Sequence, residues 1–253
     1  MKKLIFLSMF MSLIAFFISS QPVAAECNCT ERQMHSYTTV FPDGYEPAEN
    51  TKTVYLTFDD GPTKYTPEII EILAKYNVPA TFFVVGNTEY THYMSDIVEN
   101  GHAIGLHCYN HKFKEIYSST EAFFEDLQKI DDIVFEQTGV RSKITRFPGG
   151  SSVTQGGAKA IMKQLSEEIV EKGYQYFDWN CDSRDKMGVK TASGALSNIK
   201  AATEQSGNIV IVLMHDTEKI TVNYLPNVIE YYQELGYEFS ILSPSSPCIR
   251  HSW

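Results

Sequence analysis

The sequence predicts an α/β protein built from parallel βα units, in which about seven strands close or nearly close a barrel. Two observations lead to this prediction. Short apolar runs typical of buried strands recur along the chain and alternate with amphipathic stretches typical of helices. A length of 253 residues with 43% hydrophobic content is also enough for one well-buried domain, and no repeat or break in composition indicates a second.

The expected strands are short runs rich in apolar and β-branched residues. They lie at about residues 53–58, 80–86, 102–106, 143–147, 174–178, 208–214 and 238–242. Four helices are clear between them, because apolar residues recur at three- and four-residue spacing and so share one face. The faces consist of Ile69, Ile72, Leu73 and Tyr76; Phe123, Leu127, Ile130 and Val134; Ala158, Ile161, Leu165 and Ile169; and Leu225, Val228, Ile229 and Tyr232.

Three segments are expected along the chain. Residues 1–25 have the pattern of a secretory signal peptide, because two lysines precede an apolar run from Leu4 to Ile18 and Val23-Ala24-Ala25 is a suitable cleavage site. An uncleaved membrane anchor is the alternative, although the run is short for a membrane-spanning helix. Residues 26–50 contain turn-forming residues without periodicity, so an N-terminal arm or linker is expected. A single folded domain is expected at residues 51–246.

All the cysteines lie in the expected mature chain, where export makes disulfides permissible. They are Cys27, Cys29, Cys108, Cys181 and Cys248. Their number is odd, so at least one has no partner within the chain. The sequence leaves the pairing open between Cys27 or Cys29 with Cys248, Cys108 with Cys181, and unpaired buried thiols at Cys108 and Cys181.

The formal net charge of −10 argues against nucleic acid as a partner, because phosphate backbones attract basic surfaces. Loss of Lys2 and Lys3 with the signal peptide would take this charge to −12. An anionic polymer is not favoured either. A neutral or partly deacetylated glycan can be bound by aromatic side chains, and an aromatic content of 13% with 15 tyrosines is compatible with such stacking.

Two histidines four residues apart and a pair of adjacent carboxylates form a candidate metal site. His107, His111 and the pair Asp59-Asp60 offer the N, N and O donors that zinc accepts, and three ligands leave one position open for water. The acidic pair directly follows a strand-like run, so we expect it at the C-terminal end of a strand. Each part also has an ordinary alternative: the histidines could be surface or core residues, and the acidic pair a helix cap or a solvated turn.

Five short motifs occur in order along the chain. They are Thr57-Phe58-Asp59-Asp60-Gly61-Pro62, His107-x-x-x-His111, Arg146-Phe147-Pro148-Gly149-Gly150, Asp178-Trp179 and Leu213-Met214-His215. With these motifs, and with the run from Val78 to Val84, the chain resembles the polysaccharide deacetylase family, the NodB-homology carbohydrate esterases, over about residues 51–243. The resemblance implies a distorted (β/α)7 barrel whose motifs lie on the C-terminal rim of the strands.

The resemblance also implies catalytic roles. Asp59 would be the general base, held in its ionised form by the guanidinium of Arg146. His215 would be the general acid, oriented by Asp178, with Asp182 as the fallback for that role. These roles suit amide hydrolysis, which needs a nucleophile at neutral pH, a charge sink for the oxyanion and a proton for the leaving amine.

The metal ligands implied by the resemblance are Asp60, His107 and His111. Zinc is the expected ion, although cobalt, manganese and nickel accept the same donors. Four further residues are expected to contact substrate: Trp179 as a wall of the pocket, Leu213 in the acetyl pocket, and Pro148 and Gly149.

Cys108 departs from the family pattern, in which Ser or Thr follows the first metal-binding histidine. A thiol is a weaker hydrogen-bond donor than a hydroxyl. A fourth metal ligand is the alternative interpretation of Cys108, and it would close the site to water.

The expected function is that of a secreted, metal-dependent N-deacetylase acting on a polysaccharide that contains N-acetylglucosamine, with peptidoglycan as the leading substrate and the cell wall as its location. A monomer is expected, without nucleic-acid partners or a stable membrane partner. The alternatives are N-deacetylation of chitin oligomers or O-deacetylation of xylan by the same residues, an inactive glycan-binding protein on the same fold, and a structural zinc domain.

Overall fold

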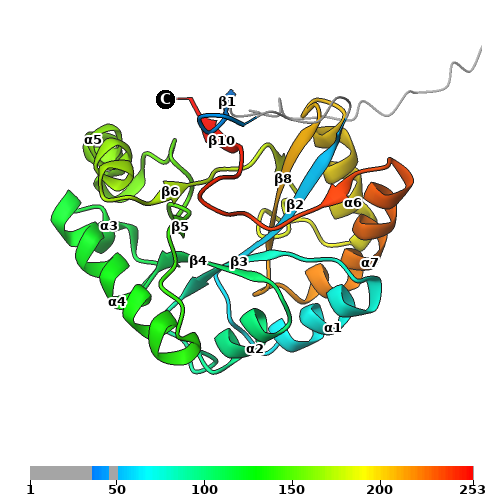
Figure 1. Ribbon diagram of the computed structural model, residues 1–253, viewed down its shortest axis with the longest axis horizontal. Helices are drawn as coiled ribbons and strands as arrows, with labels where there is room; N and C mark the ends of the chain where they lie inside the picture. The colour runs from blue at the N-terminus through cyan, green and yellow to red at the C-terminus, as the bar shows by residue number, and fades with distance from the viewer. Residues whose placement is uncertain (1–35, 46–50, 253) are drawn as a thin grey trace, which may run out of the picture. The chain divides into compact units, whose positions relative to one another are not determined.

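The computed structural model describes residues 36–45 and 51–252, and its main feature is a parallel sheet (Figure 1). The strands follow the spatial order β6 (Gln175–Tyr176), β5 (Ile144–Thr145), β4 (Ala103–Cys108), β3 (Thr81–Val85), β2 (Thr53–Asp59), β8 (Ile209–His215) and β7 (Cys181–Asp182). A short strand β9 (Glu238–Phe239) pairs with the first residues of β2. The predicted signal peptide lies outside the described residues.

Helices return the chain from one parallel strand to the next, as parallel pairing requires. They are α1 (Thr66–Tyr76), α2 (Tyr93–Glu99), α3 (Phe113–Ile116), α4 (Thr120–Thr138), α5 (Ala158–Glu171), α6 (Ala192–Thr203) and α7 (Lys219–Glu234), with a 3-10 turn at Gln155–Gly157. Figure 1 shows them in an arc outside the strands. The domain is a distorted (β/α)7 barrel, which confirms the predicted fold class. None of the described helices is both long enough and apolar enough to cross a membrane.

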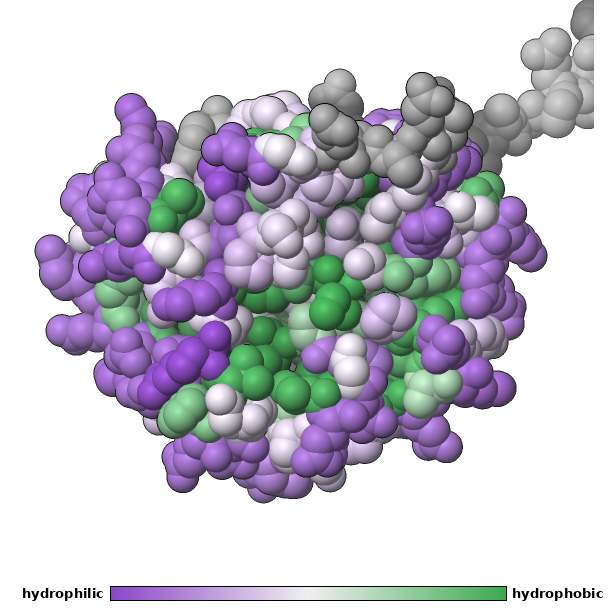
Figure 2. Space-filling model, in the orientation of Figure 1, coloured by the Kyte–Doolittle hydropathy of each residue, from purple (hydrophilic) through white to green (hydrophobic). Residues whose placement is uncertain are grey.

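The predicted helical faces pack against the sheet. Every predicted face residue of α4 and α7 is buried, and those of α1 and α5 are buried or half-buried. The central strands β2 and β8 are buried along almost their whole length. Their sequences are therefore continuous apolar runs, without the alternation of apolar and polar residues that a strand exposed on one face has. On the face shown in Figure 2, hydrophobic residues gather over the centre and hydrophilic residues surround them.

Three strands were not predicted. One is β7, a two-residue strand that pairs with β8. The others are β1 (Tyr37–Val40) and β10 (Cys248–His251), which form an antiparallel pair apart from the main sheet. Strand β1 belongs to the segment predicted as an arm or linker. Strand β10 follows residue 246, where the domain was predicted to end.

The described cysteines are free. Cys108, Cys181 and Cys248 are buried thiols, so the suggested disulfide between Cys108 and Cys181 is wrong and the alternative of unpaired buried thiols is correct for these two. Cys181 instead packs its sulfur 3.6 Å from the Tyr232 hydroxyl. Cys27 and Cys29 lie outside the described residues.

Candidate active site and metal centre

The acidic pair lies at the C-terminal end of β2, as predicted. Asp59 is the last residue of the strand, and its Cα pairs with that of His215 on β8 and that of Phe83 on β3. Asp60 has a φ of 72°, a left-handed conformation that aspartate tolerates better than most residues. This turn interrupts the alternation of the strand, so two consecutive carboxylates can serve the same site.

The turn after the pair is packed closely against the end of β8. A Cβ atom on Gly61 would lie 1.9 Å from Oδ2 of Asp216, so only glycine fits there. Asp216 is fully buried and accepts a hydrogen bond from the Thr66 hydroxyl at 2.6 Å. Burial raises the pKa of Asp216 to about 7. This contact connects the turn that carries Asp60 to the strand that carries His215.

Three donor atoms converge beside this turn. Oδ1 of Asp60 lies 3.2 Å from Nε2 of His107 and 3.4 Å from Nε2 of His111. The ligand atoms of these three residues all lie within 4.8 Å of one another. Oδ1 of Asp60 is buried and makes no hydrogen bond. A buried carboxylate oxygen that faces two imidazole nitrogens without a shared proton is suited to a divalent metal ion.

The orientation of His107 is fixed by a bulge and by a hydrogen bond. The pairing between β3 and β4 passes from Val84–Leu106 to Val85–Cys108, which leaves His107 as the extra residue. Bulges of this kind re-aim a side chain beside a functional site. Nδ1 of His107 lies 2.8 Å from the Arg146 carbonyl oxygen, to which it donates, so the Nε2 lone pair is left for a metal.

The loop that carries His111 is held by Asp126 of α4. Its carboxylate accepts hydrogen bonds from the backbone amides of Tyr109 at 2.6 Å and Asn110 at 3.2 Å. Both amides lie between the two histidine donors in the sequence, so Asp126 helps to set the separation of His107 and His111. This role of Asp126 was not predicted, because its position on an ordinary amphipathic helix gives no sign of the contact in the sequence.

The charges at the three donors suit metal binding. Burial alone would raise the pKa of Asp60, but the adjacent imidazoles of His107 and His111 lower it well below its usual value, so Asp60 is ionised. Burial lowers the pKa of His111, which favours the neutral ring that binds metals. Oδ2 of Asp60 also accepts a hydrogen bond from the ammonium of Lys186. Burial by itself lowers the pKa of Lys186, but the charge of Asp60 raises it above its usual value.

Cys108 does not belong to this group of donors. It is buried, and burial raises the pKa of its thiol well above the usual value, which disfavours the thiolate that a metal requires. Among the described residues, the group therefore offers three protein ligands, as an open catalytic site does, and the closed four-ligand interpretation is not supported.

The pairing expected between Asp59 and Arg146 is present. Nη1 of Arg146 donates to Oδ1 of Asp59 at 2.8 Å and to the Thr57 hydroxyl at 2.6 Å. Its Nε and Nη2 donate to the carbonyl oxygens of Phe177 at 2.9 Å and Asp178 at 3.3 Å. The guanidinium is fully buried. It contacts Asp59 through one nitrogen rather than through a bidentate fork, because its other donors are bound elsewhere.

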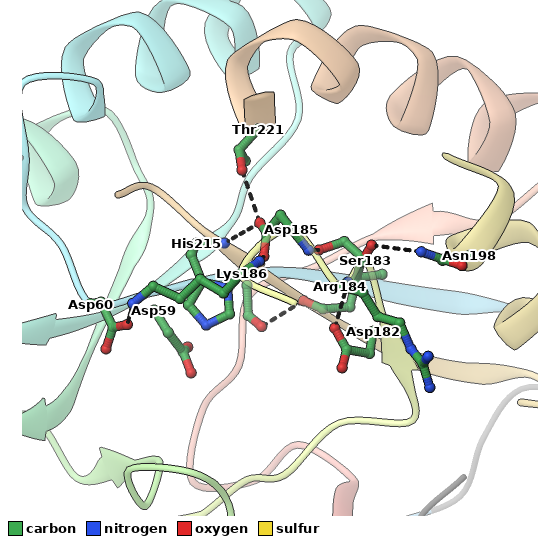
Figure 3. Close-up of polar contacts among 12 residues, drawn as sticks. Asp59, Asp60, Asp182, Ser183, Arg184, Asp185, Lys186, Asn198, His215 and Thr221 are labelled. Atoms are coloured by element: carbon green, nitrogen blue, oxygen red, sulfur yellow. Dashed lines mark hydrogen bonds and ion pairs between the residues drawn. The ribbon is translucent and has the colours of Figure 1, made fainter. Parts of the chain in front are cut away.

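The partner of His215 is Asp185, a residue that the sequence analysis did not assign (Figure 3). Nδ1 of His215 lies 2.6 Å from Oδ1 of Asp185, and the backbone amide of His215 donates to Oδ2 at 2.8 Å. The hydroxyls of Thr221 and Tyr224 each donate to Oδ2 at 2.9 Å. Burial alone would lower the pKa of His215, but Asp185, with smaller contributions from Asp59 and Asp60, raises it to about 9.

The prediction that Asp178 orients His215 is therefore wrong. The carboxylate of Asp178 accepts hydrogen bonds from the amide of Ser151 at 2.8 Å, from the Ser151 hydroxyl at 2.5 Å and from the amide of His251 at 2.8 Å. Asp178 follows β6, at the far edge of the sheet, whereas His215 ends β8 and has β7 as its neighbour. The fallback is also wrong, because Oδ1 of Asp182 accepts from the amide of Arg184 at 2.7 Å.

Position relative to β7 was the signal that could have identified Asp185. A side chain that follows β7 reaches the rim beside the end of β8, and Asp185 is the acid in that position. Asp178 was assigned to this role because Trp179 follows it in the sequence, and no strand was predicted at 181–182.

Two of the residues expected to contact substrate, Leu213 and Trp179, lie near these groups. Leu213 precedes His215 by two positions on β8, so both face the same side of the strand. The indole of Trp179 lies 5.7 Å from the Arg146 guanidinium and packs edge-on against His251. Pro148 is buried and its carbonyl accepts from the Tyr117 hydroxyl at 2.8 Å, whereas Gly149 is exposed.

Known proteins are similar to this chain in sequence and in fold. The family model described as polysaccharide deacetylase matches residues 46–175. The chain is 31% identical over 194 residues to a peptidoglycan-N-acetylglucosamine deacetylase of Bacillus cereus, an alignment that covers 74% of this chain and 68% of that protein. It is 32% identical over 182 residues to a chitin deacetylase of Arthroderma benhamiae, covering 68% of this chain and 46% of that protein.

A solved structure agrees with these matches. The catalytic domain of the peptidoglycan N-acetylglucosamine deacetylase from Eubacterium rectale superposes with a TM-score of 0.77 at 38% sequence identity. The match covers 81% of this chain and 95% of that domain. The range matched by the family model includes the three donors Asp60, His107 and His111.

Proposed function

The chain belongs to the polysaccharide deacetylase family, and we propose that it is a secreted, metal-dependent enzyme that removes N-acetyl groups from the N-acetylglucosamine residues of peptidoglycan. The observation that carries this proposal is the convergence of three metal donors, Asp60, His107 and His111, beside two further reactive groups. Asp59 is paired with Arg146, and His215, on the neighbouring strand, is paired with Asp185. A glycan-binding protein or a structural zinc domain has no need for both flanking pairs.

The donors fit a divalent metal, because a buried carboxylate oxygen without a hydrogen bond faces two imidazole nitrogens. Zinc is the ion that we propose, since a set of two histidines and one carboxylate is common in catalytic zinc sites. When bound, such an ion supplies a Lewis acid for the acetyl carbonyl and lowers the pKa of a water molecule in the site.

Asp59 acts as the general base in this proposal. Its carboxylate takes the proton of the attacking water, and Arg146 holds it in place with a single hydrogen bond of 2.8 Å. This fixed orientation favours proton transfer, because a positioned base acts without a further search for geometry.

His215 acts as the general acid. Its pKa of about 9 keeps the imidazolium form at neutral pH, ready to protonate the nitrogen of the leaving amine. Asp185 binds Nδ1, so Nε2 is the nitrogen that delivers the proton. An amine is a poor leaving group, so the N-deacetylase reaction depends on this proton.

Peptidoglycan is supported by the similarity to peptidoglycan deacetylases of Bacillus cereus and Eubacterium rectale. Secretion is supported by the signal-peptide pattern of residues 1–25. Chitin oligomers are the second candidate, because the chain is also similar to a chitin deacetylase and the acetylated sugar is the same.

The test is acetate release from peptidoglycan, chitin oligomers and acetylated xylan by the purified protein after chelation and after metal is restored. We expect metal-restored release, largest from peptidoglycan, and loss of that release in Asp59→Asn. Preference for chitin oligomers would leave the chemistry intact and reassign the substrate. No release from any of the three, with metal bound, would refute the catalytic proposal for these glycans.

A further inference from the structure

Lys186 brings a second cation to the acidic pair, and none of the five sequence motifs includes it. Its ammonium donates a hydrogen bond to Oδ2 of Asp60, while Oδ1 of the same carboxylate faces His107 and His111. The side chain of Lys186 is 39% exposed, whereas that of Asp60 is only 10% exposed. Figure 3 shows Lys186 extending from the loop after β7 toward Asp60.

The placement of Lys186 is set by its neighbour in the chain. Asp185 is fixed by hydrogen bonds from His215, Thr221 and Tyr224. The backbone amide of Lys186 also donates to Oδ1 of Asp185 at 2.9 Å. The residue that orients the general acid therefore also sets the point from which the lysine side chain reaches Asp60.

Each carboxylate of the acidic pair has its own cation, and the two cations differ. Arg146 on Asp59 is fully buried and donates to three further acceptors. Lys186 on Asp60 is partly exposed, and within residues 36–45 and 51–252 its ammonium forms an ion pair with Asp60 alone. Arg146 is therefore part of the core, whereas the main interaction of the Lys186 charge is with the metal ligand.

We propose that Lys186 is a positioning residue for the metal: it occupies Oδ2 of Asp60, so that Oδ1 alone is offered to the ion, and its charge weakens the binding of a divalent cation. This inference rests on the metal site of the proposed function. A hydrogen bond to the outer oxygen of a ligating carboxylate fixes the ligand and draws electron density from it. A less strongly donating carboxylate leaves the bound ion a stronger Lewis acid.

The two effects of Lys186 on metal affinity have opposite signs. Loss of an outer-shell partner typically weakens metal binding by about 10–100-fold. Loss of a positive charge next to a dication strengthens binding, since the repulsion scales with the product of the charges. We expect the charge effect to be the larger one, because Asp60 remains fixed by its buried turn and by its two histidine neighbours.

The test is the dissociation constant of Zn²⁺ for the metal-free full-length protein, measured by competition with a chromogenic chelator. Lys186→Met keeps the length of the side chain and removes its charge, and we expect it to bind Zn²⁺ about 10-fold more tightly than the wild type. Lys186→Arg keeps the charge and should stay close to the wild type. Lys190→Met is the matched control, because it removes one exposed lysine from the same loop and should leave the constant unchanged.

Equal or weaker Zn²⁺ binding by Lys186→Met would overturn the inference. Damage to the fold can only weaken binding, so tighter binding cannot arise from a loosened site. An unchanged constant in Lys186→Met, together with metal-dependent acetate release by the wild type, would reject the role of Lys186 and leave the proposed function standing. Absence of Zn²⁺ binding by the wild type itself would reject both.

Discussion

Two charged pairs lie beside the candidate metal centre, and the buried residue that holds its partner is a cation in one pair and a carboxylate in the other. On the side of β5, the cation Arg146 is fully buried and holds the carboxylate of Asp59, whose side chain is 6% exposed. On the side of β7, the carboxylate of Asp185 is fully buried and holds the imidazole of His215, whose side chain is 14% exposed. In each pair the holding residue is the more buried one, and the reactive residue retains contact with the site.

The buried charges of Arg146 and Asp185 are each stabilised by several hydrogen bonds. Taking a charge out of water is costly unless further hydrogen bonds satisfy it. Arg146 donates to Thr57 and to two backbone carbonyls besides Asp59. Asp185 accepts from a backbone amide and from the hydroxyls of Thr221 and Tyr224 besides Nδ1 of His215. A buried cation therefore positions the carboxylate of Asp59, and a buried carboxylate positions the imidazole of His215.

The largest expected effect comes from removing the base. Asp59→Asn should lower kcat for deacetylation by about 10²–10⁴-fold, because the amide cannot take the proton of water. The metal content should stay at the wild-type level, since Asp59 is not among the three donors. Metal analysis and acetate release on the same sample check both points. An active Asp59→Asn variant would show that another group is the base.

The loss of rate on replacing His215 should depend on the leaving group of the substrate. His215→Gln should lower the rate on an N-acetylated glycan by about 10²–10³-fold, because the amine needs a proton to leave. The loss on an aryl acetate should be much smaller, since a phenolate leaves without protonation. Rates on both substrates measure the contrast. Equal losses on the two would argue against His215 as the proton donor, whereas Asp59→Asn should reduce both.

Replacement of the holding residue should change the pH dependence. Asp185 raises the pKa of His215 to about 9, and the protonated ring is the active form. Asp185→Asn should therefore move the alkaline limb of kcat/KM to lower pH. Asp178→Asn is the matched control, because Asp178 contacts Ser151 and His251 rather than His215, and its alkaline limb should not move. A shift in the control alone would restore the original assignment of Asp178.

The same pair should contribute to stability in a defined pH range. The pKa of His215 is raised on folding, so its stabilising contribution is complete below the unfolded value of about 6.5 and is lost as the pH rises through about 9. Asp185→Asn should be less stable than the wild type at pH 6, and the difference should narrow toward pH 10. Thermal unfolding across this range measures it. A difference that widens with pH would contradict the sign of the linkage.

The smallest effect is expected at Cys108. Cys108→Ser should leave the metal stoichiometry unchanged and alter the rate only slightly, because the thiol lies outside the group of donors. Metal analysis and acetate release again provide the measurement. Loss of the metal in this variant would indicate that Cys108 is a fourth ligand. Such a closed site would have no open position for the water that the proposed reaction needs.

Much of the fold was predictable because its long strands are continuous apolar runs. The runs at 53–58 and 208–214 correspond closely to β2 and β8, and these two central strands bring Asp59 and His215 side by side. The three metal donors were predictable for a related reason. Asp60 directly follows β2, His107 is the second-last residue of β4, and His111 is close to His107 in the sequence.

The acid side was less predictable because it depends on a strand of only two residues. Cys181–Asp182 is too short to show a periodicity, yet its pairing with β8 decides which acid reaches His215. Asp126 and Lys186 were missed for a different reason: each acts through a contact between segments distant in sequence, and neither belongs to a motif. Local pattern identifies residues at the ends of strong strands, whereas contacts between loops require the three-dimensional fold.

The most direct test of the account is a titration of acetate release from peptidoglycan against Zn²⁺ added to the chelated protein, with His107→Gln and His111→Gln as controls. We expect activity to rise linearly, to saturate at one equivalent of Zn²⁺ per chain, and to stay near background in both controls. Full activity before metal is added, or wild-type activity in either histidine variant, would contradict it.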